Sequence, residues 1–168
     1  LALERQHPLD YLLDGYYGRW LNCAEGLLVD SAIIAPDAVE ARVRKMQGED
    51  VEEPPAPEPN KPDYKPTAAG SIRQIDDPPK YKVGDRVRAR NISPAGHTRL
   101  AGYVRGHSGT VRALHPAQVL PDTNAHFLGE NPQHVYNVSF DSHDIWGPEA
   151  EKFTVNFDLY ESYIEEDK

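Results

Sequence analysis

Eight prolines lie between residues 49 and 79, and they separate two parts of the sequence that have different hydrophobic periods. The stretch contains almost no large aliphatic residues, and its composition is typical of a linker or an extended strap. We expect residues 49–79 to form a proline-rich strap that lies along a surface. It would connect a helical segment, residues 1–48, to a β domain, residues 80–168, in a chain of the α+β class.

The first part has the apolar period of helices. From Pro8 to about Ala32, apolar residues recur at steps of three and four, and Pro8 suits the first position of a helix. A second, shorter helix is predicted from Pro36 to about Gln47. Two helices of this length bury too little apolar surface to be stable alone, so we expect them to pack on another polypeptide.

The last part has the alternating pattern of strands. Apolar and basic residues alternate over 86–90, and further short strands are predicted at 102–106, 109–114, 135–140 and 153–163. Glycine and proline turns separate these strands. Short strands with such turns, in a segment of about 90 residues, predict a small SH3-like β-barrel.

Basic residues are concentrated in this second part. Residues 80–112 hold eight Lys or Arg and a single acid, Asp85, although the net charge of the chain is −9. A cationic region in an acidic chain predicts a local anionic partner, whereas the overall acidity argues against general nucleic-acid binding. Arg99 and Arg105 are the candidates, because the arginine fork can hold an oxyanion through two parallel hydrogen bonds. The alternative is a solvated or salt-bridged arginine at the surface.

Other residues suggest a pocket wall but no metal site. Tyr16, Tyr17 and Trp20 combine apolar rings with polar tips, which suits a pocket wall, although a helix core or a subunit contact fits equally. The seven histidines lack paired ligand spacing, and Cys23 is the single cysteine, so we expect this chain to bind no metal. No apolar run reaches about 18 residues, which excludes a membrane-spanning helix. No secretory signal pattern opens the sequence, so we expect a cytoplasmic protein.

Taken together, these residues resemble the beta subunit of nitrile hydratase. The helical segment contributes Tyr11-Leu12, Tyr16-Tyr17 and Trp20-Leu21 to this resemblance. The second part contributes an ordered series of motifs: Val83-Gly84-Asp85, Gly96-His97-Thr98-Arg99-Leu100, Tyr103-Val104-Arg105-Gly106, Gly109, Pro121-Asp122, Gly129-Glu130, Tyr136-x-Val138-x-Phe140 and Trp146-Gly147. The resemblance covers nearly the whole chain.

The resemblance implies the non-metal subunit of an enzyme that adds water to a nitrile to give an amide. Cobalt(III), or alternatively iron(III), would sit in the alpha subunit on a Cys-x-x-Cys-Ser-Cys loop, two of whose cysteines are oxidised. This chain would hold no cofactor and would be inactive alone. Arg99 matches an arginine that contacts the cysteine oxygens, and Tyr16 and Trp20 match residues that wall the substrate pocket. We therefore expect Arg99 and Tyr16 to be catalytic, and Trp20 and Tyr17 to line the pocket.

The family's beta chain normally begins with a further stretch, before the position of Leu1, that carries a second arginine for the cysteine oxygens. The resemblance therefore implies a separate small subunit that supplies this head, as in the three-subunit toyocamycin nitrile hydratase, or else a cleaved or unresolved N-terminus. Three alternatives stay open. The chain could be a subunit of thiocyanate hydrolase, a non-catalytic SH3-like module that binds RNA, or a scaffold for the metal subunit.

Overall fold

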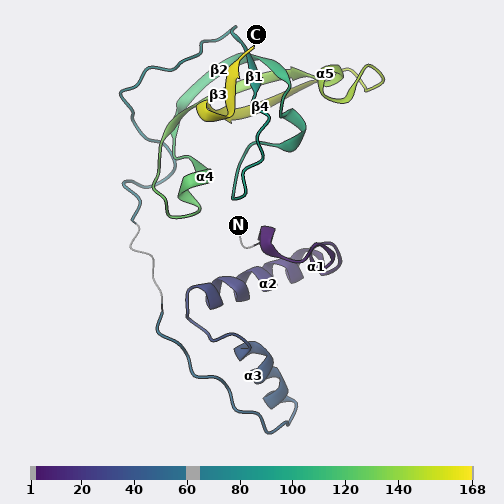
Figure 1. The fold of residues 1–168 in the computed structure, drawn as a ribbon, viewed down its shortest axis with the longest axis vertical. Helices are drawn as coiled ribbons and strands as arrows, with labels where there is room; N and C mark the ends of the chain where they lie inside the picture. Colours follow the sequence, from purple (N-terminus) through teal and green to yellow (C-terminus); the bar gives the residue numbers. More distant parts are fainter. Residues whose placement is uncertain (1–2, 60–64, 168) are drawn as a thin grey trace. The chain divides into compact units, whose positions relative to one another are not determined.

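The computed structural model describes residues 3–59 and 65–167 of a chain that divides into two compact units, Leu1–Asp63 and Tyr64–Lys168 (Figure 1). We call them the helical unit and the sheet unit and describe each by itself. The helical unit consists of a 3-10 turn η1 (Leu3–Arg5) and three helices, α1 (Pro8–Leu13), α2 (Gly15–Asp30) and α3 (Ala38–Met46). No helix in the described ranges is both long and apolar enough to cross a bilayer.

The prediction of one helix over residues 8–32 is wrong at a single point. The helix is interrupted between α1 and α2, where Gly15 has a φ of 65°. This left-handed conformation suits glycine, which has no Cβ to clash with the backbone. Asn22 of α2 donates a hydrogen bond of 2.7 Å to the Asp14 carboxylate at the interruption. The second predicted helix is confirmed as α3.

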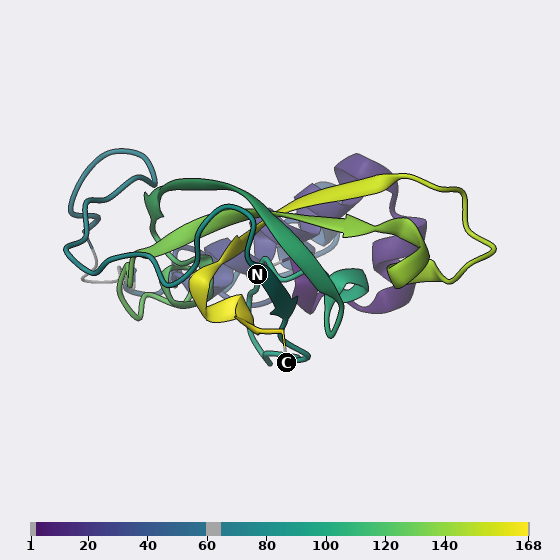
Figure 2. The same ribbon diagram turned by 90° about the horizontal axis from the view of Figure 1, so that it is seen from above.

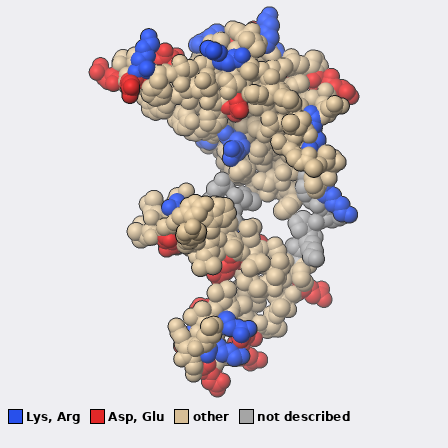
Figure 3. All heavy atoms as spheres, turned by 180° about the vertical axis from the view of Figure 1, so that it is seen from behind, with Lys and Arg blue, Asp and Glu red and all other residues tan. Residues whose placement is uncertain are grey.

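The helical unit has almost no core of its own. Among its described residues, Cys23 and Ala41 are the buried apolar ones. Broad areas of this unit carry no charged side chain (Figure 3). Many large apolar side chains are exposed on it, and a contiguous apolar surface on a monomeric protein is typical of an interaction site. The most exposed large apolar side chains are Leu12, Leu13, Tyr17, Leu21 and Met46.

The sheet unit is built on five antiparallel strands in the order β4-β3-β2-β1-β5 (Figures 1 and 2). The alternation predicted over residues 86–90 is confirmed, because Val87 and Ala89 of β1 are fully buried, whereas Arg86, Arg88 and Arg90 are exposed. The strands are β1 (Arg86–Ala89), β2 (Ser108–Gln118), β3 (Gln133–Asp141), β4 (Thr154–Tyr160) and β5 (Ile164–Glu166). Short helices α4 (Pro121–Asn124) and α5 (Ser142–Trp146) flank β3.

The closure expected of a barrel is not observed. No pairing joins β4 to β5 among the described strands, so the sheet is open between them. The chain nevertheless passes from one edge of the sheet to the other through the three residues of the 3-10 turn η3 (Glu161–Tyr163). A connection this short keeps the end of β4 near the start of β5, which requires a strongly curled sheet.

The core lies on the inner face of this sheet. Its largest fully buried side chains are Leu100, Tyr136, Phe140, Leu159 and Tyr163. One predicted strand, at 102–106, is wrong, because Gly102–Val104 forms a 3-10 turn, η2, whose Val104 is buried in the core.

The proline-rich stretch is shared between the two units. Residues 51–59 have no regular structure, and Glu53 forms ion pairs of 3.0 and 3.1 Å with Arg42 and Lys45 of α3. The division between the units, at 63/64, lies within the segment that we expected to be a strap. Residues 60–64 are outside the described part of the chain.

The end of the stretch is hydrogen bonded to the sheet unit. Ile72 forms an isolated β-bridge with Gln118, and the amide of Arg73 donates to the Ala117 carbonyl at 2.9 Å. The Arg73 guanidinium donates through Nε to the Glu130 carboxylate at 2.8 Å, and both side chains are almost fully buried. The backbone and the hydroxyl of Thr67 donate to the same carboxylate. Residues 67–73 are therefore fixed against the sheet unit.

Candidate functional site

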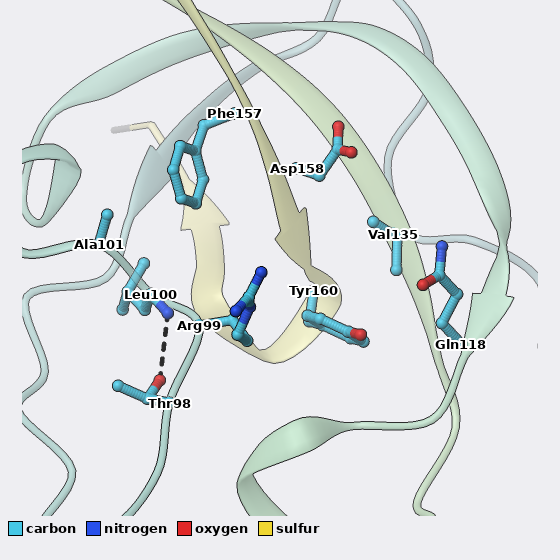
Figure 4. A pocket seen from close by; sticks show the side chains of 9 residues that line it. All are labelled: Thr98, Arg99, Leu100, Ala101, Gln118, Val135, Phe157, Asp158 and Tyr160. Carbon is cyan, nitrogen blue, oxygen red and sulfur yellow. Dashed lines mark hydrogen bonds between the residues drawn. The ribbon is translucent and has the colours of Figure 1, made fainter. Parts of the chain in front are cut away.

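Arg99 lies on the border of a hollow in the sheet unit. The hollow has a volume of about 440 Å³, and its lining includes Arg99, Leu100, Phe157, Asp158 and Tyr160. Figure 4 shows the Arg99 side chain directed into this space, with the ring of Tyr160 beside it. Arg99 is exposed, and no hydrogen bond or ion pair to its guanidinium exists within the described ranges. Its five N–H donors are thus available to an external anion.

The loop that carries Arg99 is held from two sides. We call residues 96–100 the Arg99 loop. At one end, the His97 amide donates to Nε2 of His126 at 3.1 Å. At the other end, the Arg99 amide donates to the Tyr163 hydroxyl at 3.2 Å, and this hydroxyl donates to the Asp122 carboxylate. The loop has no helical or strand hydrogen bonds, so hydrogen bonds that involve side chains, these among them, hold its conformation.

Glycine allows a close approach to His126 at the start of the loop. A Cβ on Gly96 would lie 2.3 Å from Nε2 of His126, far inside van der Waals contact. The glycine of the Gly-His-Thr-Arg motif therefore lets the backbone approach the imidazole that accepts from His97. This close approach explains why the motif begins with glycine.

Arg105 has a different role from Arg99. Its guanidinium donates to the Leu100 carbonyl at 2.8 and 3.3 Å and to the Ser93 hydroxyl at 3.0 Å. These bonds connect the Arg99 loop to the residues before and after it. Of the two arginines that the sequence analysis selected as oxyanion ligands, Arg105 is used internally and Arg99 is not.

The tyrosines near Arg99 are neutral hydrogen-bonding groups. Burial, together with the hydrogen bond to Asp122, raises the pKa of Tyr163 to about 12. Burial also raises the pKa of Tyr160, whereas the positive charge of Arg99 acts in the opposite direction. Tyr160 donates to the Val119 carbonyl at 3.0 Å. Both hydroxyls therefore keep their protons at neutral pH.

The other basic residues of 80–112 are mostly paired. Arg86 and Arg88 lie 3.5 and 3.3 Å from the Asp167 carboxylate, and Lys80 lies 3.2 Å from that of Glu161. These pairs neutralise much of the face that an RNA-binding module would use. No observation in the described residues favours RNA as a ligand.

The three aromatic residues singled out from the sequence lie together on α2. The Tyr16 and Tyr17 rings meet edge to face at 5.2 Å, and the Tyr16 and Trp20 centroids are 6.3 Å apart. All three are more than half exposed, at 66%, 83% and 52%. They form an open aromatic surface of the helical unit, whereas Arg99 belongs to the sheet unit.

Sequence reasoning missed the residues that hold the Arg99 loop. Asp122 follows a proline in α4, His126 follows that helix, and Tyr163 ends the turn η3. The motif Pro121-Asp122 was the one available signal, and it does not indicate what Asp122 contacts. Within the described ranges, no group of three or more His, Cys, Asp or Glu side chains has the geometry to hold a metal ion.

Comparisons with known proteins identify the same family in the helical unit and in the sheet unit. The chain matches the family "Nitrile hydratase beta subunit, N-terminal" over residues 1–69 and "Nitrile hydratase beta subunit, C-terminal" over residues 70–166. It is 37% identical to a cobalt-containing nitrile hydratase subunit beta of Pseudonocardia thermophila, over 98% of this chain and 73% of that protein. It is 36% identical to a low-molecular weight cobalt-containing nitrile hydratase subunit beta of Rhodococcus rhodochrous, over 97% of this chain and 75% of that protein.

A thiocyanate hydrolase subunit alpha of Thiobacillus thioparus is more distantly similar. It is 30% identical over 51% of this chain and 71% of that protein. The two family matches together span residues 1–166, and the beta-subunit similarity extends through the helical unit, the proline-rich stretch and the sheet unit. On these grounds, the chain belongs to the nitrile hydratase beta subunit family.

Proposed function

We propose that this chain is the non-metal subunit of a nitrile hydratase, which hydrates nitriles to amides together with a metal-bearing alpha subunit. The observation that carries the proposal is the exposed Arg99 guanidinium in a hollow whose loop is held by His126 and Tyr163. An unpaired cation on a fixed loop fits an anion that comes from another chain. The isolated chain would then be inactive.

Arg99 would hydrogen bond the oxygens of oxidised cysteines that hold the metal in the alpha subunit. The planar fork of arginine suits sulfenic and sulfinic oxygens, because two parallel N–H groups can meet one or two acceptors. Cobalt(III), or alternatively iron(III), would supply Lewis acidity to the nitrile or to water. The chain's own contribution would be to orient the oxygens and to keep bulk water from them.

The helical unit would provide the apolar wall of the substrate pocket and much of the partner interface. Tyr16, Tyr17 and Trp20 present an open aromatic surface, which suits contact with an apolar nitrile. The exposed leucines of α1 and α2 would be buried against the alpha subunit, which supplies the core that this unit lacks. The free thiol of Cys23, the single cysteine of the chain, fits a cytoplasmic location.

The test is Arg99→Lys in the assembled, metal-loaded complex, with Arg86→Lys as the matched control. A hydrogen bond to a charged partner is worth about 1.5–3 kcal/mol, so we expect kcat to fall by about 10- to 100-fold. Lysine retains the charge but lacks the fork, so assembly and metal content should stay normal. Arg86 pairs with Asp167 and should tolerate lysine. Near-full turnover by Arg99→Lys would remove Arg99 from the mechanism.

A second candidate is a subunit of thiocyanate hydrolase, which the similarity to the Thiobacillus thioparus subunit favours. One assay distinguishes the two candidate activities. The assembled complex is offered an aromatic nitrile and, in parallel, thiocyanate. Amide formation without thiocyanate hydrolysis supports the first candidate, and the reverse result supports the second.

A further inference from the structure

The Tyr163 hydroxyl is the meeting point of three hydrogen bonds at the Arg99 loop. It accepts from the Arg99 amide at 3.2 Å and from the Thr98 hydroxyl at 3.4 Å, and it donates to Asp122. The Thr98 hydroxyl in turn accepts from the Leu100 amide at 3.2 Å (Figure 4). One phenol can donate once and accept twice, so all its capacity is used.

The group that makes these bonds is itself rigid. Tyr163 is 2% exposed, and its ring packs edge to face against Tyr160 at 5.5 Å. Asp122, in α4, is about forty residues away in the sequence and fixes the direction of the hydroxyl proton. A buried tyrosine with its proton directed to a carboxylate leaves its lone pairs facing the loop.

From this geometry, and resting on the proposed function of Arg99, we propose that Tyr163 and Asp122 are positioning residues for the reaction. They fix the backbone at Thr98 and Arg99, and thereby the point from which the Arg99 guanidinium reaches the partner's oxygens. Neither residue contacts the reacting atoms. Their effect is to hold one arginine within the narrow range of positions that a preorganised donor requires.

The chain contains a matched control for this proposal. Tyr136 is also buried, accepts from the Lys80 amide at 3.0 Å and donates to the Glu161 carboxylate at 2.6 Å. It therefore has the same hydrogen-bonding pattern as Tyr163, but at a loop without Arg99. Removing either hydroxyl should destabilise the fold similarly. Only the removal at Tyr163 should affect Arg99.

The first measurement is amide hydrogen exchange on the full chain without its partner. In Tyr163→Phe we expect exchange over residues 96–100 to accelerate by about 2- to 10-fold, which corresponds to the loss of one hydrogen bond. Tyr136→Phe should leave this peptide unchanged. Equal protection of residues 96–100 in both variants would overturn the proposal without any reference to catalysis.

The second measurement is a double-mutant cycle in the assembled, metal-loaded complex. We expect Tyr163→Phe to lower kcat about tenfold with little change in KM, because in the proposed function Arg99 contacts the cysteine oxygens and not the nitrile. In an Arg99→Lys background, the same substitution should have no further effect, since Tyr163 acts through Arg99. Asp122→Asn should show the same dependence on Arg99.

The outcomes separate the two proposals. If Arg99→Lys is itself fully active, the role of Arg99 fails. If Arg99→Lys is impaired but Tyr163→Phe resembles Tyr136→Phe, only the positioning role fails. A Tyr163 effect that persists at full size in the Arg99→Lys background would also refute it, because Tyr163 would then act by another route.

Discussion

Replacement of Gly96 by alanine tests whether the contact with His126 holds the Arg99 loop. The new Cβ would lie 2.3 Å from Nε2 and 3.0 Å from Cε1 of His126. Ordinary contacts begin near 3.4 Å, so the ring or the loop must move by roughly 1 Å, as in other overpacked sites. The displaced atom is the acceptor of the His97 amide, so the movement also breaks that bond.

The expected cost follows from these two effects. Overpacking costs about 1–3 kcal/mol, and a net hydrogen bond about 0.5–1.5 kcal/mol. Alanine restricts the unfolded chain and returns about 0.4–1 kcal/mol. We therefore expect a loss of about 0.5–4 kcal/mol in the free energy of unfolding of the sheet unit. For a unit of this size, each kcal/mol lowers Tm by about 4–8 °C.

The effect on turnover should be larger than the effect on stability. A displacement of roughly 1 Å in a positioning element can reduce turnover by about 100-fold. Thermal melting of the chain and kcat of the assembled complex measure the two effects separately. Gly102→Ala is the control, because a Cβ at Gly102 meets no atom within 4 Å. If Gly96→Ala melts and turns over like Gly102→Ala, the imidazole contact does not hold the loop.

Two further predictions concern the helical unit and the proline-rich stretch. Tyr16→Phe should lower kcat of the assembled complex moderately, about 3- to 10-fold, through one lost hydrogen bond to the substrate or the partner, and an unchanged rate would leave Tyr16 as packing only. Hydrogen bonds from Arg73 and Thr67 lower the pKa of Glu130 from 4.5 to about 2. The ionised Glu130 carboxylate should therefore contribute fully to the free energy of unfolding above pH 4.5, and this contribution should be lost as the pH falls towards 2. The free energy of unfolding, measured with denaturant between about pH 2 and 5, should fall less steeply with falling pH in Glu130→Gln than in the unchanged protein. The same pH profile in both proteins would contradict the role given to Glu130.

Elements with a clear local period were predictable from the sequence. The alternation at 86–90 identified β1, whose apolar face is buried, and the apolar steps of three and four identified the helices, because about 2 and 3.6 residues are the periods of the two backbones. The interruption at Gly15 was missed, since a single glycine within a helical pattern does not by itself indicate a left-handed residue. The 3-10 turn at 102–104 was mistaken for a strand, because a short apolar run has no distinguishing period.

The candidate site was predictable in part. The Gly-His-Thr-Arg motif identified Arg99, and the resemblance to a known family supplied its expected partner. The groups that hold its loop were not predictable, since Asp122, His126 and Tyr163 are about 23 to 64 residues away from Arg99 and have no common spacing.

The sequence by itself determined the alternation of β1, the helical period of the first part and the family, and it narrowed the candidate oxyanion ligands to Arg99 and Arg105. Only the tertiary structure showed that Arg105 is used internally while Arg99 is not, that the sheet stays open, and that one tyrosine hydroxyl fixes the Arg99 backbone. The physical reason is that local patterns specify which face of an element is buried, whereas a hydrogen bond between distant residues depends on the distances and directions that the folded chain establishes.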